Sequence, residues 1–493
     1  MNGQLQGSFK GGKGLCQGDP ISPLLFVLVI EYLTRALHGA AKDKKFRFHP
    51  LCKSLNITNL CFADDLLLVC KAHASSIQII QQSFETFSAA SGLYINNSKS
   101  RIFFGGISGT EKAYLLSLSK MTEGSFPLVY LGMPLIPTKW KSIDCDLIIL
   151  KIRQRLHGWA SRNLSYAGRV QLIQSVLMGI RNYWMSIFLL PQKVIKEIDC
   201  LCRNFLWGGK GTRSKFHLAS WDLVCRPKSY GGLGIKEGSL WNKINFARFI
   251  WAISSKQDIL WVKWVNCIYL KGVQIWDYEL HKDSSWYWKK LIKMSKSSSN
   301  SILNEAVIQG KFQLSKLYLL SIPGIPINSM KAVWYNLSVP KHRFILWQVI
   351  NQKLLTRDLL QHCHIPIISL NCLVCEVELE SHSHLFFDCI LSKRVLQAVA
   401  VWLGGLIWFE KFKDWSSWLN DSRNGGLARV VSATLAATVY YLWLNRNKCC
   451  FDSSCYLDFL IKESVKARVF SLSFRAKKQT LREKLMIHFF SSL

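Results

Sequence analysis

The first part of the chain contains two segments whose apolar residues follow the spacing of an α-helix. One begins at Ser22, a capping side chain, and Pro23, which suits the first helical turn. From Leu24 to Leu37 it is apolar almost all round, which predicts a helix buried inside a domain. In the second segment, Gly92 is placed to end a helix whose apolar positions are Ile77, Ile80, Phe84 and Phe87.

Two short apolar runs between these helices have the composition of β-strands. They cover residues 60–63 and 66–70, and Asp64 and Asp65 stand at the junction between them. The pattern predicts a hairpin that carries two adjacent carboxylates near its turn. Strands and helices together indicate an α+β segment that extends to about Pro137.

The remainder of the chain follows mainly helical patterns. Residues 138–293 are rich in Trp, Lys and Arg. After Pro191, one apolar stripe at helical spacing is formed by Val194, Ile198, Leu201 and Phe205. A turn is expected at the glycines that interrupt the helical pattern, Gly231, Gly232 and Gly234. The run 294–300, in which Lys and Ser dominate, is a candidate linker.

We therefore predict a predominantly helical α+β protein in four parts. Residues 1–137 form an α+β domain, and residues 138–293 form a helical second part. Residues 311–402 form a small third domain, and residues 403–493 form a basic, helical C-terminal connector.

The charge of the chain narrows the choice of partners. Among 493 residues, 63 Lys and Arg stand against 31 Asp and Glu, a formal net charge of +32. The excess is spread along the sequence, as in a folded surface that lies along a polyanion, and nucleic acid is the most economical such partner. The alternative is a surface charged for solubility, which rarely needs so large an excess of one sign.

No segment is expected to enter or cross a membrane. The polar opening of the chain lacks the apolar core of a secretory signal peptide. The most apolar runs, 24–30 and 430–444, are shorter than the roughly 20 residues that span a bilayer. We therefore expect an intracellular protein, nuclear or cytoplasmic, with no membrane partner. In a reducing compartment, clusters among the 16 cysteines suit metal better than disulfides.

One group of cysteines has the spacing of a metal site. Cys372 and Cys375 form a CxxC pair, and Cys389 follows shortly after them. Either His382 or His384 completes a set of three Cys and one His, which is a common tetrahedral set for structural Zn²⁺. Further ligand types lie close by in the sequence at His362, Cys363 and His364.

The paired carboxylates Asp64 and Asp65 indicate a second kind of metal chemistry. Adjacent carboxylates repel each other, and Mg²⁺ relieves that repulsion because it prefers carboxylate, water and phosphate oxygens. Two such ions stabilise the attacking and leaving oxygens of an in-line phosphoryl transfer. The simpler interpretation is an acidic turn, since Asp is common in turns.

Four motifs in this order resemble the reverse transcriptases of LINE-type, non-LTR retrotransposons of the plant kind. Residues 14–24 are similar to the loop and helix that lie beneath template and incoming nucleotide, and residues 62–65 to the catalytic hairpin. Residues 91–100 are similar to the next motif of the polymerase palm, and residues 130–135 to the primer-grip turn. The resemblance implies a partial palm, a helical thumb over residues 138–293 and a small zinc-binding domain.

The resemblance also implies a role for each matched residue. Asp64 would bind the catalytic Mg²⁺ or Mn²⁺ ions, Asp65 would support that site, and Lys99 would lie near the triphosphate unless it is a plain surface lysine. The other implied roles are template or nucleotide contacts for Gln17, Gly18, Ser22 and Pro23, and the primer grip for Tyr130, Leu131 and Gly132. Basic helices beside aromatic residues can follow a phosphate backbone, so Arg162, Arg169 and Lys228 are candidate phosphate contacts. The implied partners are an RNA template and an RNA–DNA or DNA duplex.

In the zinc-binding domain of this family, the pattern Glu-Ser-x-x-His-Leu-Phe-x-x-Cys matches residues 380–389. The resemblance therefore selects His384 over His382. It assigns structural Zn²⁺ to Cys372, Cys375, His384 and Cys389. Such proteins are often labelled as ribonuclease H proteins, but the acidic residues of the segment 401–493 do not suggest a ribonuclease H domain.

One departure from the family weakens the expectation of activity. The first catalytic aspartate motif of the family precedes the motifs matched here, and this sequence does not contain it. Two-metal catalysis needs ligands on both sides of the ion pair. We therefore expect a polymerase fragment that binds nucleic acid but is inactive alone. The alternatives are a non-catalytic nucleic-acid-binding remnant and a protein-interaction role for the zinc-bearing region.

Overall fold

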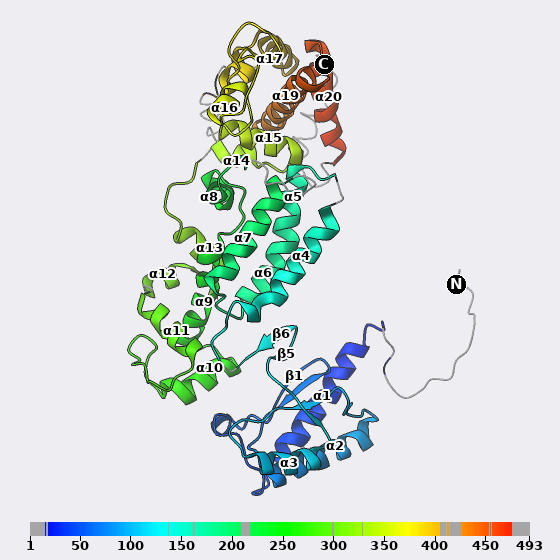
Figure 1. Cartoon of the computed structure of the whole chain (residues 1–493), viewed down its shortest axis with the longest axis vertical. Coiled ribbons are helices and arrows are strands. Elements are labelled where there is room, and N and C mark those ends of the chain that lie inside the picture. The colour runs from blue at the N-terminus through cyan, green and yellow to red at the C-terminus, as the bar shows by residue number, and fades with distance from the viewer. Residues whose placement is uncertain are drawn as a thin grey trace, which may run out of the picture. The chain divides into compact units, whose positions relative to one another are not determined.

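The computed structural model describes residues 15, 18–136, 138–160, 163–208, 217–297, 300–327, 329–404, 411, 414, 425–452, 454 and 456–475. The chain is divided into two compact units (Figure 1), one of Met1–Trp140 with Phe249–Ser299 and one of Lys141–Arg248 with Asn300–Leu493. Most of the described residues are helical, which confirms the predicted predominance of helix. The predicted helical part 138–293 is divided between the units, and the four-part division stays a prediction.

The first unit combines helices with short paired strands. Its helical segments are α1 (Ser22–Ala40), η1 (Lys53–Leu55), α2 (Ala74–Ser91), α3 (Gly109–Ser119), α10 (Leu260–Val265), η5 (Asn266–Leu270) and α11 (Trp286–Ser297). Its strands pair as β1 (Asn59–Phe62) with β2 (Asp65–Leu68), β3 (Arg101–Ile102) with β4 (Thr122–Glu123) and β5 (Leu128–Tyr130) with β6 (Met133–Leu135). The β3–β4 pair is parallel and the other two pairs are antiparallel.

The core of this unit lies where α1 meets α2. Leu33 and Leu37 of α1 are buried together with Phe84 and Phe87 of α2, and side chains of β2 pack against them. The helix α2 ends as predicted at Gly92, whose φ of +74° is a left-handed conformation that glycine adopts without steric strain. This packing holds the β1–β2 hairpin on the unit's main pair of helices.

Helix α1 differs from its prediction at its start and in its burial. The N-cap position is held by Ile21 rather than Ser22. The Ile21 N–H donates to a carboxylate oxygen of Asp19 at 3.1 Å, so an upstream aspartate stabilises the turn that leads into the helix. The first half of α1 is largely exposed, and full burial begins only at Leu33, so the helix is not buried all round.

The same helix passes a simple test for membrane spans. Among the described residues, α1 is the one helix whose length and composition would let it cross a membrane. Length and composition are weak evidence, because the core helix of a folded domain passes the same test. One side of α1 is such a core face, since Leu33 and Leu37 pack against α2.

The run 294–300, predicted as a linker, is largely helical instead. Helix α11 continues through Ser297, and α12 (Asn300–Glu305) begins three residues later. Ser295 is fully buried on the same face of α11 as Leu291 and Ile292. Ser295, Lys296 and Ser297 therefore belong to an amphipathic helix, whose polar face resembles a linker in composition.

The second unit is built from helices with one short strand pair among its described residues. Its N-terminal half contains η2 (Ile143–Cys145), α4 (Asp146–Ala160), α5 (Tyr166–Leu172), η3 (Ile173–Leu177), α6 (Met178–Met185), α7 (Gln192–Trp207), α8 (Trp221–Cys225), η4 (Lys228–Tyr230) and most of α9 (Gly238–Ser254). After α12 it contains β7 (Val307–Ile308), β8 (Lys311–Phe312), α13 (Leu314–Leu320), α14 (Ser329–Val333), α15 (Pro340–Ile350), α16 (Arg357–His362), η6 (His384–Asp388), α17 (Ile390–Trp402), α19 (Gly425–Phe451) and α20 (Asp458–Arg475).

The predicted stripe of α7 is shifted by one residue in its second half. Val194 and Ile198 are buried as expected, but Leu201 and Phe205 are only half-buried. The fully buried positions there are Cys202, Leu206 and Trp207. Because an α-helix has 3.6 residues per turn, a stripe can follow steps of four residues as well as steps of three, and the neighbouring helices decide which.

The glycines at 231, 232 and 234 form the predicted turn. Gly231 and Gly234 have φ values of +83° and +78°. A Cβ atom on Gly232 would lie 2.0 Å from the carbonyl oxygen of Arg226, so a side chain at this position would collide with the backbone. The indole N–H of Trp347 in α15 donates to the Gly231 carbonyl at 2.7 Å, which fixes the turn on α15.

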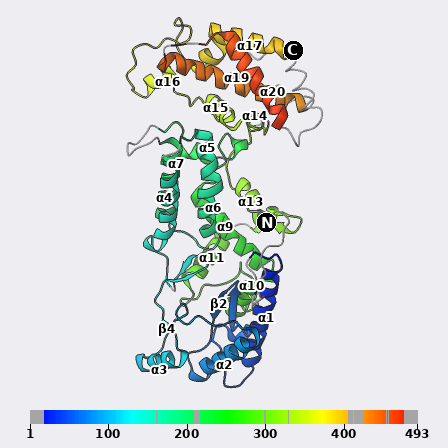
Figure 2. The ribbon, with the colours of Figure 1, turned by 90° about the vertical axis from the view of Figure 1, so that its right-hand side faces the viewer.

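The C-terminal helices pack on the region predicted to bind zinc. In the second unit, α19 contacts α15 and η6, and α20 contacts α17. Helices α19 and α20 lie side by side in both views (Figures 1 and 2). Apolar and small side chains of α19, including Val430, Ala436 and Val439, are buried in this packing. The segment predicted as a connector therefore contributes buried helices to the second unit.

Candidate zinc site and catalytic hairpin

The CxxC pair lies in a tight, hydrogen-bonded loop. Asn371 and Leu379 form a β-bridge across the base of this loop. The N–H of Cys372 donates to the carbonyl of Glu378 at 2.6 Å, and the N–H of Glu376 donates to the carbonyl of Cys372 at 2.8 Å. These bonds turn the chain so that the thiols of Cys372 and Cys375 face the same point.

A second segment brings the other two candidate ligands to that point. His384 begins the π-helical turn η6, and Cys389 directly precedes α17. The ligand atoms of Cys372, Cys375, His384 and Cys389 all lie within 4.8 Å of one another, and Cys375 Sγ is 3.3 Å from His384 Nε2. Tetrahedral Zn²⁺ with Zn–S bonds near 2.3 Å places its ligand atoms about 3.8 Å apart, so these residues fit the ion after small shifts.

Burial and hydrogen bonds shift the pKa values of Cys372 and Cys389 in opposite directions. The bond from the Cys372 thiol lowers the pKa of Cys389, and the backbone N–H groups of Leu391 and Ser392 at the start of α17 lower it further. The same thiol bond and burial raise the pKa of Cys372. The start of α17 thus favours a thiolate at Cys389, which is the form that binds metal.

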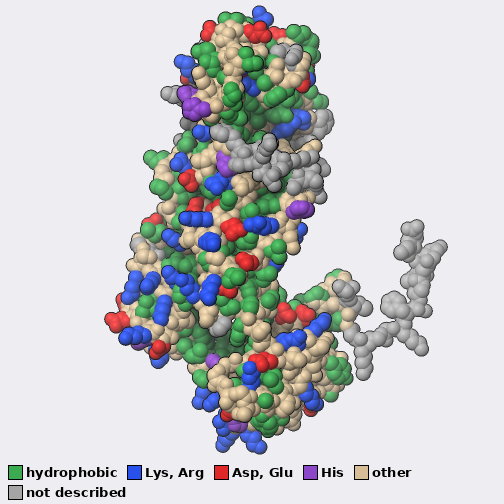
Figure 3. All heavy atoms as spheres, viewed as in Figure 1, with side chains coloured by type: hydrophobic (Ala, Val, Ile, Leu, Met, Phe, Trp, Pro, Cys, Tyr) green, Lys and Arg blue, Asp and Glu red, His purple; other side chains and the backbone are tan. Residues whose placement is uncertain are grey.

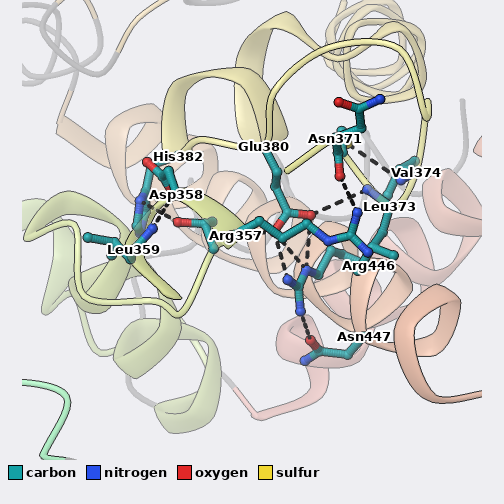
Figure 4. Close-up of polar contacts among 12 residues, drawn as sticks. Arg357, Asp358, Leu359, Asn371, Leu373, Val374, Glu380, His382, Arg446 and Asn447 are labelled. Carbon is teal, nitrogen blue, oxygen red and sulfur yellow. Dashed lines mark hydrogen bonds and ion pairs between the residues drawn. The ribbon is translucent and has the colours of Figure 1, made fainter. Parts of the chain in front are cut away.

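His382 lies apart from this cluster. Its Nε2 accepts a hydrogen bond from the N–H of Leu354 at 3.2 Å, and its Nδ1 lies 3.3 Å from the hydroxyl oxygen of Thr356. Figure 4 shows His382 beside the start of α16. The structure therefore places His384, and not His382, with the three cysteines. The sequence neighbours His362, Cys363 and His364 are not members of this cluster.

A buried ion pair that sequence reasoning missed lies next to the CxxC loop. The side chains of Glu380 and Arg446 are 0% and 6% exposed, and their closest oxygen–nitrogen distance is 2.7 Å. Glu380 also accepts hydrogen bonds from the backbone N–H groups of Arg357 and Leu373 (Figure 4). Glu380 stood in the family pattern and could have been singled out, but nothing in the sequence pointed to Arg446.

The predicted catalytic hairpin is present at β1–β2. Phe62 pairs with Asp65 across the ladder, so Ala63 and Asp64 form the two-residue turn and Asp65 begins β2. Ala63 has a φ of +49°, a left-handed conformation that costs free energy in a residue with a Cβ atom. Both carboxylates are exposed at the tip of the hairpin.

The predicted primer-grip residues form a second hairpin in the same unit. Tyr130 ends β5, and the left-handed residues Leu131 and Gly132 make the turn into β6. Burial raises the pKa of Tyr130, and the negative charge of nearby Asp65 raises it further. The structure thus brings one predicted primer-grip residue close to one predicted catalytic carboxylate.

The structure describes some, but not all, of the residues predicted to contact template, nucleotide and triphosphate. Gln17 lies outside the described residues, whereas Gly18 has a φ of +97° just before α1. Ser22 and Pro23 form the first turn of α1. The backbone N–H of Lys99 donates to Asn96 Oδ1 at 3.2 Å, and its exposed side chain pairs with no carboxylate in the described residues. Nothing in these contacts tests the predicted roles.

The predicted phosphate contacts have distinct surroundings. Arg162 lies outside the described residues. The guanidinium of Arg169 donates to the carbonyls of Phe205, Leu206 and Gly208, so it caps the C-terminal end of α7. The ammonium of Lys228 lies 4.9 Å from the ring centre of Trp334, and burial together with the charge of Arg343 lowers its pKa.

Two segments of the chain match known protein families. Residues 1–135 match the reverse transcriptase (RNA-dependent DNA polymerase) family, and residues 312–395 match the family of zinc-binding domains in reverse transcriptases. This chain is related to LINE-type reverse transcriptases. The Asp64–Asp65 hairpin lies inside the first matched segment, and all four candidate zinc ligands lie inside the second.

The sequence of this chain is also similar to those of two known proteins. The chain is 35% identical over 129 residues to the "Putative ribonuclease H protein" of Arabidopsis thaliana. This match covers 26% of this chain and 21% of that protein. It is 27% identical over 246 residues to the "Transposon TX1 uncharacterized 149 kDa protein" of Xenopus laevis, which covers 48% of this chain and 17% of that protein. The matched part of this chain spans about a fifth of the length of either relative.

Proposed function

We propose that this chain is part of an RNA-directed DNA polymerase of a non-LTR retrotransposon. The observation that carries this proposal is the exposed Asp64–Asp65 hairpin inside the segment that matches the reverse transcriptase family. In this proposal, residues 1–137 are a partial palm, residues 138–293 a thumb, residues 311–402 a zinc-binding domain and residues 403–493 a helical connector.

The two carboxylates at the hairpin tip suit a divalent metal ion, but a two-metal site needs more ligands than these two. Asp64 and Asp65 would bind Mg²⁺ or Mn²⁺, which neutralises charge on the phosphates in a phosphoryl transfer. Among the described residues, no further His, Cys, Asp or Glu joins them in a group of three. Because a two-metal site needs ligands on both sides of the ions, we propose that the chain alone does not extend primers.

The zinc-binding domain has a structural role in this proposal. With three cysteines and one histidine, Zn²⁺ would have no open position for a substrate. Cys372, Cys389 and His384 are buried, so solvent has little access to the ion. Bound Zn²⁺ would contribute directly to the stability of the fold around it.

Helix α11 offers the clearest surface for a nucleic-acid backbone. It carries no acidic residue, and four of its twelve residues are lysines, namely Lys289, Lys290, Lys293 and Lys296. Like charges three or four residues apart destabilise a helix by about 0.2–0.5 kcal/mol per pair, so an all-lysine face is unfavourable without an anionic partner. Among the described residues, no carboxylate lies within ion-pair distance of these lysines.

An aromatic side chain lies among these cations. Trp286, the first residue of α11, has Lys139 at 5.9 Å and Lys290 at 5.7 Å from its ring centre. Figure 3 shows Lys and Arg side chains gathered over the region of α11 on the viewed face. Lysines beside a half-buried aromatic ring suit a polynucleotide, because the cations neutralise phosphates and the ring offers a stacking surface.

The nucleic-acid proposal is tested by binding an RNA template annealed to a DNA primer at several salt concentrations. We expect affinity to fall steeply with salt and the logarithmic slope to lessen by about 2–3 in the triple variant Lys289→Ala, Lys293→Ala and Lys296→Ala, roughly 0.7–0.9 for each lost contact. The control is Lys263→Ala, since Lys263 already pairs with Asp258 at 2.5 Å. An unchanged slope in the triple variant would contradict the proposed surface.

The catalytic part of the proposal is tested by primer extension on the same duplex with Mg²⁺ or Mn²⁺. We expect binding without extension. The second candidate, a non-catalytic nucleic-acid-binding remnant, is favoured by the missing third carboxylate among the described residues and gives the same outcome for the chain alone. Extension that is lost in Asp64→Asn would reject the remnant and show that the hairpin still works.

A further inference from the structure

We propose that Arg446 of α19 is a positioning residue for the zinc site and acts through the buried carboxylate of Glu380. The inference rests on the proposed zinc binding. It assigns a role to a residue that lies outside the segment 312–395 matched by the zinc-binding family. Helix α19 would then help to position the zinc ligands rather than serve only as a connector.

Glu380 joins the two segments that carry the zinc ligands. One of its carboxylate oxygens accepts a hydrogen bond from the N–H of Leu373, the residue directly after Cys372, at 3.4 Å. Its own N–H donates to Leu370 at the start of the same loop at 2.9 Å. The next residue, Ser381, accepts a hydrogen bond from the N–H of His384 through its hydroxyl oxygen at 3.1 Å.

The same carboxylate also fixes the start of α16. Its second oxygen accepts from the N–H of Arg357 at 3.0 Å, and the Glu380 carbonyl accepts from the N–H of Asp358 at 3.2 Å. The Arg357 guanidinium in turn donates to the carbonyl of Asn371 at the base of the CxxC loop, at 2.6 Å. These contacts surround Glu380 in Figure 4. A shift of Glu380 would therefore move the loop that holds Cys372 and Cys375.

Arg446 compensates the charge of this carboxylate. Its Nη2 lies 2.7 Å from one carboxylate oxygen, and its Nε lies 3.1 and 3.2 Å from the two oxygens. The guanidinium also lies 5.1 Å from the ring centre of Trp443, and its Nη1 donates to Asn447 at 3.3 Å. Both partners come from the same stretch of α19, so the helix holds the guanidinium in place.

Loss of the guanidinium would leave a carboxylate that is buried and unpaired. Such a group takes up a proton or draws in water, and both changes weaken the acceptor that holds the N–H of Leu373. Groups that orient metal ligands without touching the metal typically change metal affinity by about 10- to 100-fold when they are removed. Arg446, 66 residues from Glu380 in the sequence, should therefore control zinc affinity.

The test is Zn²⁺ affinity of the full chain, measured in competition with a chromophoric chelator, together with the absorption spectrum of bound Co²⁺. We expect Arg446→Met and Glu380→Gln each to weaken Zn²⁺ binding by about 10- to 100-fold and to alter the Co²⁺ spectrum. The matched control is Lys466→Met, which breaks the partly exposed pair with Glu463 on α20. That variant should bind both ions as the wild type does.

A double variant separates positioning from simple loss of stability. Glu380→Gln with Arg446→Met leaves no unpaired charge, so its loss of affinity should be smaller than the two single losses combined. Wild-type affinity and spectrum in a folded Arg446→Met variant would overturn the inference. If that variant does not fold, Glu380→Gln keeps the inference testable, and wild-type affinity and spectrum in a folded Glu380→Gln variant would also overturn it. A wild-type chain that binds no Zn²⁺ would reject the zinc proposal itself.

Discussion

His342 should make the second unit sensitive to mild acid. Its side chain is 1% exposed in the first turn of α15 and stacks on Tyr440 of α19 at a ring distance of 4.4 Å. Burial lowers the pKa of His342 from 6.5 to about 3, and the charges of Lys341 and Arg468 contribute. The folded protein thus keeps a neutral imidazole at a pH where the unfolded chain binds a proton.

The sign and size of the effect follow from that difference. Because the folded pKa of His342 is lower than the unfolded value, the unfolded state binds more protons and stability falls as the pH drops below about 6.5. Integrated from pH 7 to pH 5, the lost free energy of unfolding is about 1.9 kcal/mol. Asp199 acts in the opposite direction, since burial raises its pKa to about 6 and its protonation favours the folded state.

Comparing variants isolates the histidine from Asp199 and from the zinc ligands. The assay is urea unfolding at pH 7 and pH 5 of wild type, His342→Phe and His38→Phe, where Phe retains an aromatic ring against Tyr440 and His38 is an exposed control. We expect His342→Phe to lose about 1.9 kcal/mol less than wild type between the two pH values, and His38→Phe to behave as wild type. Equal losses in wild type and His342→Phe would refute the reasoning.

Two further predictions concern single positions. Gly232→Ala should destabilise the protein by about 1–3 kcal/mol, because its Cβ would lie 2.0 Å from the Arg226 carbonyl oxygen. Gly179→Ala in α6 meets no atom within 4 Å and should stabilise the protein by about 0.5–1 kcal/mol. Thermal unfolding measures both changes, and equal unfolding temperatures for the two variants would contradict this prediction. Arg169→Met should cost about 1–2 kcal/mol as a lost helix cap without changing the salt dependence of nucleic-acid binding, and a changed salt slope would instead support its predicted phosphate contact.

The features that sequence predicted well are those that depend on neighbouring residues. Gly92 ends α2 because a left-handed residue is needed at that point, and the hairpin at Asp64 follows from two apolar runs separated by a short turn. The choice of His384 needed more, because spacing alone allowed His382 equally. The family resemblance supplied that choice, and the structure places His384 with the cysteines.

The features that sequence missed depend on residues far apart in the chain. No local pattern links Glu380 to Arg446, because the pair forms only when α19 packs on the zinc-binding region. Arg169, whose phosphate contact stays a prediction, also caps the end of α7 through its guanidinium, which no local pattern indicated. The run 294–300 resembled a linker in composition, yet its described residues Met294 to Ser297 continue α11, and Ser295 lies on the buried face of that helix.

The measurement that tests the account most directly is the zinc content of the purified chain, determined by elemental analysis for wild type, Cys375→Ser and His382→Ala. The account predicts one Zn²⁺ per wild-type chain, loss of zinc in Cys375→Ser and retention in His382→Ala, since the His382 ring faces Leu354 and Thr356 instead of the cysteines. A zinc-free wild type, or loss of zinc in His382→Ala with retention in His384→Ala, would contradict it.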